Sequence, residues 1–151
     1  MNKGIIVCGH GKFGVGLTNS LEMIAGKQEH YHVVVFSESD PIEKLSEDLE
    51  AAMNQLLEDC QGVVFCCDLL GGSPFKAAMT LANDRDNCAV IVGTNLPMLL
   101  DLSLSRDMDD EEDVHQLARR VVETGKEGLL MVEKIVVSED GVDDDFDGDG
   151  I

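Results

Sequence analysis

Residues 4–14 read GIIVCGHGKFG, a short apolar run followed by a glycine-rich loop. The apolar run at residues 5–8 has the length and composition of a buried strand. It leads into GHGKFG (residues 9–14), which matches the glycine pattern G-x-G-x-x-G of dinucleotide-binding loops. The same loop contains His10, a side chain that a dinucleotide does not need. The stretch therefore predicts either a loop that holds a nucleotide or a loop that presents a histidine.

Further apolar runs alternate with amphipathic segments along the chain. Together with the first run they predict strands at residues 4–8, 32–36, 62–67 and 88–92, without the polar alternation of a sheet that has one wet face. The order of strand and helix, four times repeated, predicts an open, doubly wound α/β fold with helices on both faces. We expect four parallel strands in the order 2-1-3-4 and a short antiparallel edge strand at residues 134–137.

Capping residues predict where the helices begin and end. Asp40 is expected to cap a helix that starts at Pro41, and Ser73 a helix that starts at Pro74. Acidic residues 109–113 are expected to form the start of the last helix, and Gly125 is expected to cap its end.

Composition limits the class of protein. The 151 residues suit one domain, no apolar run approaches the ~20 residues of a membrane span, and no signal peptide is expected. The five cysteines are odd in number, and four of them fall in strand-like runs, which predicts reduced thiols and a cytoplasmic protein. The net charge of −19 argues against nucleic acid and anionic membranes as partners; it favours a basic protein partner or serves solubility alone.

A nucleotide site would need an acid near the end of the second strand to bind the ribose. Glu38 stands there, 24 residues after Gly14. The chain, however, has no room for a substrate domain, and a lone glycine pattern is a weak signal. We therefore favour the interpretation in which the loop presents its histidine.

The loop after the third strand is suited to an anion. Gly71 and Gly72 permit a nest of backbone amides, and the following helix starts at Ser73 with its positive dipole end towards the loop. The alternative is a merely tight turn between strand and helix. In the predicted sheet, strands one and three are neighbours, so His10 and Asp68 should face each other. A carboxylate bonded to one imidazole nitrogen leaves the other with a free lone pair, which suits a histidine that attacks phosphorus.

Three stretches carry a resemblance to a known family: GIIVCGHGKFGVGL, DLLGGSPFKAA and VIVGTNLPMLL. In this order they resemble the IIA component of the mannose-family bacterial sugar phosphotransferase system, over roughly residues 3–137. The resemblance implies a cytoplasmic phosphocarrier without a cofactor. It would take a phosphoryl group from phospho-HPr on His10 and pass it to the IIB component, with the membrane IIC and IID components further along the chain of transfer.

The resemblance also implies roles for individual residues. Asp68 would orient His10, and Gly71, Gly72 and Ser73 would bind the phosphoryl group. Candidate contacts to protein partners are Lys12, Phe13, Lys76, Asn95 and Pro97. A homodimer would form by exchange of the C-terminal strand. The family commonly has asparagine at Lys76 and alanine at Gly14, and neither departure removes a proposed catalytic group.

Residues 1–137 would thus form the IIA domain, and residues 138–151, with seven acidic residues, an acidic tail that we expect to be disordered. Two other functions stay open on the sequence: a phosphocarrier domain that serves a dihydroxyacetone kinase, and a non-catalytic regulatory module. No metal site is expected, because His30 and His32 lack a third ligand and the aspartates at 143–147 lack the glutamate of a calcium loop. A thiol nucleophile at Cys66 or Cys67 is not expected either.

Overall fold

The computed structural model describes residues 2–134 and contains a parallel sheet with the strand order β2-β1-β3-β4. Its strands are β1 (Lys3–His10), β2 (Tyr31–Phe36), β3 (Gly62–Cys67) and β4 (Cys88–Ile91). The predicted parallel sheet and its strand order are confirmed. The central strands β1 and β3 are buried along almost their whole length, which is why their sequences show no polar alternation.

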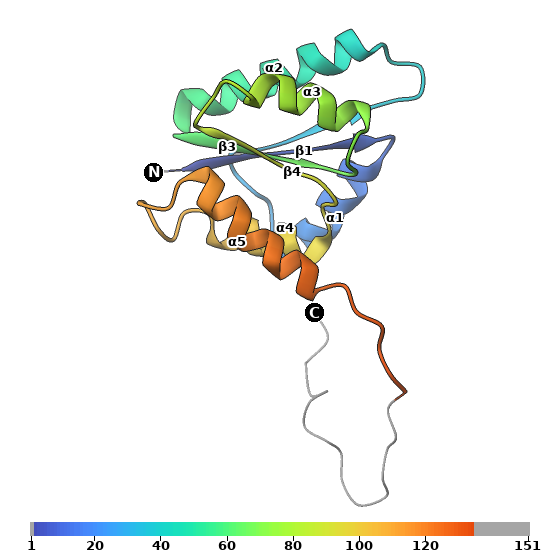
Figure 1. Cartoon of the computed structure of the whole chain (residues 1–151), viewed down its shortest axis with the longest axis vertical. Coiled ribbons are helices and arrows are strands. Elements are labelled where there is room, and N and C mark those ends of the chain that lie inside the picture. Colours follow the sequence, from blue (N-terminus) through green and yellow to red (C-terminus); the bar gives the residue numbers. More distant parts are fainter. Residues whose placement is uncertain (1, 135–151) are drawn as a thin grey trace, which may run out of the picture.

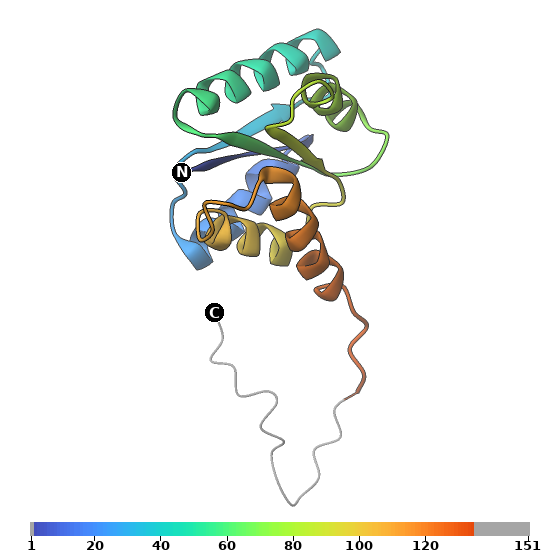
Figure 2. The same cartoon turned by 60° about the vertical axis from the view of Figure 1, so that its left-hand side comes forward.

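Helices cover both faces of the sheet (Figures 1 and 2). The helices are α1 (Phe13–Ala25), α2 (Ile42–Asp59), α3 (Ser73–Ala82), α4 (Leu96–Ser105) and α5 (Val114–Glu127). Helices α2 and α3 cover one face, and α1, α4 and α5 cover the other. Alternate residues of the central strands divide between the two cores: Ile6 and Phe65 pack with α2 and α3, whereas Val7 and Val64 pack with α4 and α5.

Several predicted helix ends are wrong by a few residues. Helix α2 begins at Ile42 after Pro41, and the carboxylate of Asp40 instead accepts a hydrogen bond from the backbone N–H of Ser37 (3.0 Å). Ser73 is the first residue of α3, and Gly72 occupies the N-cap position. In both places the N-cap residue of the helix lies one position away from the residue that capping preference predicted.

The segment after β4 forms two helices, α4 and α5, on the same face of the sheet. Residues 109–112 precede α5, and Asp113 caps it by accepting hydrogen bonds from the backbone N–H groups of His115 and Gln116 (2.8 Å each). Gly125 does not end α5 but lies inside it, where an added Cβ would stand 2.9 Å from the Cβ of Met98. Its lack of a side chain therefore allows α4 and α5 to approach closely.

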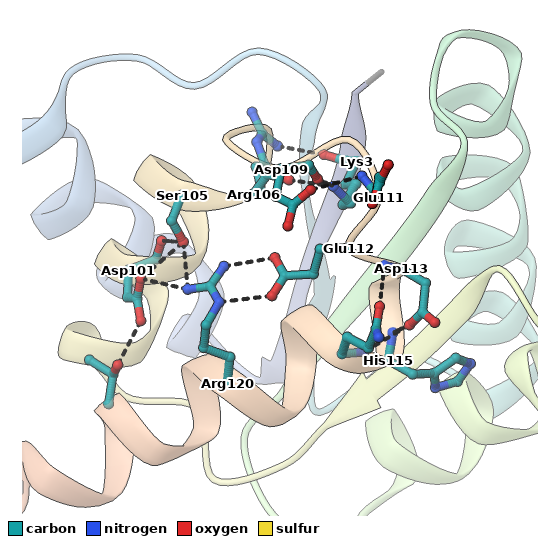
Figure 3. Close-up of polar contacts among 12 residues, drawn as sticks. Lys3, Asp101, Ser105, Arg106, Asp109, Glu111, Glu112, Asp113, His115 and Arg120 are labelled. Carbon is teal, nitrogen blue, oxygen red and sulfur yellow. Dashed lines mark hydrogen bonds and ion pairs between the residues drawn. The ribbon is translucent and has the colours of Figure 1, made fainter.

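A polar network fixes the loop between α4 and α5 at the amino end of β1 (Figure 3). His10 lies at the opposite end of this strand. The side chain of Lys3 is buried, and its Nζ donates to the backbone carbonyls of Arg106 (2.7 Å) and Asp109 (3.0 Å). Arg106 in turn donates to the carbonyl oxygens of Lys3 and His30 (3.1 Å each). These bonds satisfy two buried cations with backbone oxygens, and they make this end of the sheet a structural anchor.

The proposed edge strand at 134–137 and the acidic tail at 138–151 lie outside the described residues, except for Lys134. Residues 129–134 form neither helix nor strand, and they lead away from the body of the molecule (Figure 1). Among the described residues, no helix has the length and apolar character that crossing a membrane requires.

Candidate active site

His10 and Asp68 lie side by side because β1 and β3 are neighbours in the sheet. His10 ends β1, Asp68 directly follows β3, and the residues Cys8 and Cys67 pair across the two strands. The carboxylate Oδ2 of Asp68 accepts hydrogen bonds from the backbone N–H of His10 (2.8 Å) and from its ring nitrogen Nδ1 (2.7 Å). The structure thus brings together the two residues that the sequence analysis paired.

This contact determines the chemistry available to the imidazole. Because Nδ1 carries the proton that it donates to Asp68, the neutral ring keeps its lone pair on Nε2. The side chain of His10 is 49% exposed, whereas that of Asp68 is only 9% exposed. An imidazole in this state can act as a nucleophile through Nε2, and the largely covered carboxylate favours that tautomer.

Asp68 is kept ionised by its hydrogen bonds. Burial raises the pKa of this carboxyl group, but the hydrogen bonds from the backbone and ring of His10 and from the N–H of Leu69 outweigh burial and hold the pKa below its ordinary value. Gly9 permits this close packing, since an added Cβ would stand 2.6 Å from Phe13 and 3.0 Å from the Asp68 carboxyl carbon. A larger residue at Gly9 would force the two loops apart.

The amino end of α3 lies next to the imidazole. A Cβ added to Gly72 would stand 2.9 Å from Cε1 of His10 and 3.7 Å from Nε2. Gly71 has φ +82°, a conformation that glycine adopts readily and that turns the loop into α3. The first backbone N–H groups of α3, like those of any helix, have no acceptor within the helix. The hydroxyl of Ser73 has no hydrogen-bond partner within the described part of the chain. Amides, a hydroxyl and a helix dipole are thus available to an anion on Nε2.

The remaining predicted residues lie around this site or behind it. Lys12 and Lys76 are exposed at the beginnings of α1 and α3, and Phe13 is half-buried against Gly9. Asn95 has structural contacts: it accepts from the N–H of Met98 (3.1 Å) and donates to the carbonyl of Gly125 (2.8 Å). Contact of any of these residues with a partner stays a prediction.

Pro97 is half-buried and lies against the end of α5, where an added Cβ on Gly128 would stand 2.7 Å from it. Glu38, the acid that a nucleotide would need, is exposed in the loop after β2.

One neighbour of His10 was missed in the sequence analysis. The ring of Phe36, the last residue of β2, lies 5.8 Å from the His10 ring between centroids. Its position at the carboxyl end of the strand beside β1 is the signal that could have found it.

Comparison with known proteins identifies the family of this chain. Residues 4–121 match the model of a family described as the phosphotransferase system (PTS) fructose IIA component, and the chain belongs to this family. The mannose-specific EIIAB component of Escherichia coli K12 is 36% identical over 129 residues, which are 85% of this chain and 39% of that protein. The fructose-specific EIIA component of Bacillus subtilis is 31% identical over 103 residues, covering 68% of this chain and 70% of the relative.

Solved structures show the same architecture. The EIIA component from Streptococcus agalactiae superposes with a TM-score of 0.74 at 32% identity, covering 86% of this chain and 97% of that one. A mannose/sorbose-specific IIA subunit from Enterococcus faecalis gives a TM-score of 0.80 over 91% of this chain and 100% of that one; at 22% identity this likeness concerns the fold alone. The family resemblance inferred from the sequence is confirmed, and the alternatives of a kinase-serving domain or a regulatory module are not favoured.

Proposed function

We propose that this protein is a phosphocarrier subunit of a sugar phosphotransferase system. Phospho-HPr donates a phosphoryl group to Nε2 of His10, and the IIB component accepts it for sugar uptake and phosphorylation through the membrane IIC and IID components. The observation that carries the proposal is the bond from His10 Nδ1 to Asp68 together with the 49% exposure of the His10 side chain. Family membership and the sugar-specific names of the relatives support it.

In the proposed step, the lone pair of Nε2 attacks phosphorus while the bond from phosphorus to the donor breaks and the donor keeps the electron pair. The imidazole becomes positively charged as the new bond forms, and the ionised Asp68 stabilises that charge through Nδ1–H. The amides at the start of α3 and the Ser73 hydroxyl would bind the oxygens of the group in transfer. Transfer to IIB is the same displacement in reverse.

Labelling tests the proposal. Incubation with phosphoenolpyruvate, the upstream kinase and HPr should add one acid-labile, alkali-stable phosphoryl group to the wild-type protein and none to His10→Ala. His115→Ala is a matched control, because this half-exposed histidine on α5 should leave labelling unchanged. Stoichiometric labelling of His10→Ala would refute the proposed role.

We propose further that the protein is cytoplasmic and forms a homodimer by exchange of its C-terminal strand. Within the described residues, β4 has a single neighbour, β3, and a groove of about 670 Å³ runs between its other edge and α5. Residues 129–132 read LLMV and are 62–85% exposed. An open strand edge and an apolar segment that leaves its own subunit support an edge strand supplied by a second copy.

A further inference from the structure

The aromatic ring of Phe36 contacts the imidazole of His10 directly. Phe36 and His10 end neighbouring parallel strands and are register partners in the β1–β2 ladder. Their ring centroids are 5.8 Å apart and their planes meet at 61°, an edge-to-face arrangement. Aromatic pairs favour this geometry at centroid separations of roughly 4.5–7 Å. The contact therefore restrains the tilt of the imidazole, in addition to the hydrogen bond at Nδ1.

The main chain of Phe36 also binds the loop that follows His10. The backbone N–H of Gly11 donates to the carbonyl oxygen of Phe36 (2.8 Å), and the two residues form an isolated antiparallel bridge. Gly11 has φ +57°, so the chain turns sharply just after His10. The position of His10 on its loop thus depends on the end of β2 as well as on β3.

A second restraint on the ring is needed for in-line transfer. Asp68 binds the backbone N–H of His10 but only one atom of its ring, Nδ1, and a single hydrogen bond to the ring would let the imidazole tilt about that contact. Gly72 borders the ring at Cε1 and offers only a backbone there. A tilt would swing Nε2 away from the amino end of α3, and misplacement of a reacting atom by about 1 Å can cost much of a rate.

We infer that Phe36 is a positioning residue for His10: its ring holds the imidazole at the angle from which Nε2 faces both the incoming phosphorus and the amino end of α3. The inference rests on the proposed phosphoryl transfer. It assigns the ring of Phe36 a role distinct from that of its carbonyl oxygen, which bonds to Gly11 in any residue at this position.

The test compares Phe36→Leu with Phe36→Tyr. Leucine keeps the apolar volume and the main-chain bond to Gly11 but removes the aromatic ring, and tyrosine restores the ring. We expect Phe36→Leu to lower the single-turnover transfer rate at saturating phospho-HPr by about threefold to tenfold, with the HPr concentration for half-saturation unchanged. Phe36→Tyr should recover most of the rate. Val35→Ala, at the neighbouring residue with 38% exposure, controls for a weakened edge strand and should transfer normally.

Nuclear magnetic resonance of the unphosphorylated protein gives an independent measurement. The ring current of Phe36 should shift the His10 ring-proton resonances, and this shift should disappear in Phe36→Leu and persist in Phe36→Tyr. Unchanged transfer in Phe36→Leu, or equal loss in Phe36→Leu and Phe36→Tyr, would overturn the positioning role. A wild-type protein that accepts no phosphoryl group would refute the proposed function. In that case the resonances still test the inference, because unchanged His10 resonances in Phe36→Leu would show that the two rings do not touch.

Discussion

At the scale of single residues, the half-exposed side chain of His10 and the largely covered side chain of Asp68 suit the two roles that we propose for them. A nucleophile that meets a protein partner has to be accessible, whereas the carboxylate that orients it gains strength from being partly removed from water. The structure provides both: the His10 side chain is 49% exposed, and Oδ2 of Asp68 receives two hydrogen bonds from the same histidine.

Replacement of Asp68 by asparagine should slow transfer strongly. The amide keeps the shape of the carboxylate, but it lacks the charge that stabilises the imidazolium and selects the tautomer. We expect the phosphorylation rate of His10 to fall by roughly 10²–10⁴-fold, measured by rapid-quench transfer from phospho-HPr. The fold should persist, as judged by circular dichroism. Wild-type kinetics in Asp68→Asn would show that the carboxylate has no catalytic role.

Asp68 should also make stability depend on pH in a defined direction. Its pKa lies below the ordinary value in the folded protein, so the unfolded chain binds the proton more readily. The stabilisation is therefore fully present above the unfolded value of 3.8 and is lost as the pH falls through the lower folded value. The difference in unfolding free energy between wild type and Asp68→Asn, from urea titrations, should be larger at about pH 5 than at about pH 2.5. A difference that grows on acidification would contradict the assigned pKa direction.

At the scale of elements, the loop after β4 shows how one side chain sets the arrangement of two helices. Asn95 caps α4 through Met98 and binds the carbonyl of Gly125 inside α5. Its amide offers an acceptor and a donor at once, and both are used. This explains the residue more directly than contact with a partner does.

Asn95→Ala should accordingly lower the free energy of unfolding by about 1–2 kcal/mol, because it removes the cap and leaves the buried carbonyl without its donor. Asn95→Asp is the matched variant: it keeps the acceptor for Met98 but not the donor for Gly125, so its loss should be intermediate. Chemical denaturation measures both. Slower transfer from phospho-HPr with unchanged stability would instead indicate that Asn95 touches a partner.

The sequence predicted the strands better than the helix ends, for a physical reason. A strand buried on both faces, such as residues 62–67, must be apolar throughout, and this leaves a clear signal. The end of a helix depends on which backbone groups the tertiary structure satisfies. Gly125 resembles a helix terminus in the sequence, but in the fold it provides space for Met98 at the crossing of α4 and α5.

The candidate site divides in the same way. His10 and Asp68 could be paired from the sequence, because carboxyl ends of neighbouring strands meet at one edge of the sheet. That Phe36 lies near His10 could also have been inferred from its place at the carboxyl end of the strand beside β1, but the contact between the two rings could not, since it depends on the exact register of β1 with β2 and on the ring orientations. Topology predicts which loops meet; it does not predict which side chains touch.

At the scale of the whole molecule, the two ends of the sheet have different roles. At the amino end of β1, Lys3 and Arg106 are buried and bonded to backbone carbonyls, which favours a rigid anchor. At the carboxyl ends, the imidazole is exposed beside loops with glycines at positive φ. The sheet thus presents the half-exposed His10 at one end, while hydrogen bonds from the side chains of Lys3 and Arg106 to backbone carbonyls hold the other end in place.

The proposed homodimer gives a prediction for the whole chain. The predicted strand at 134–137, which contains three β-branched residues, is too short to stand alone and would add to a sheet edge, which we propose to be the open edge of β4 in a second copy. Deletion of residues 138–151 should leave the dimer intact, because the acidic residues of this segment repel one another and are not expected to pair with a strand edge. Deletion of residues 133–151 should give a monomer or an aggregate, because it removes the exchanged run and leaves β4 uncovered. Light scattering distinguishes these outcomes, and a full-length protein with the mass of one subunit would favour a strand that returns to its own β4.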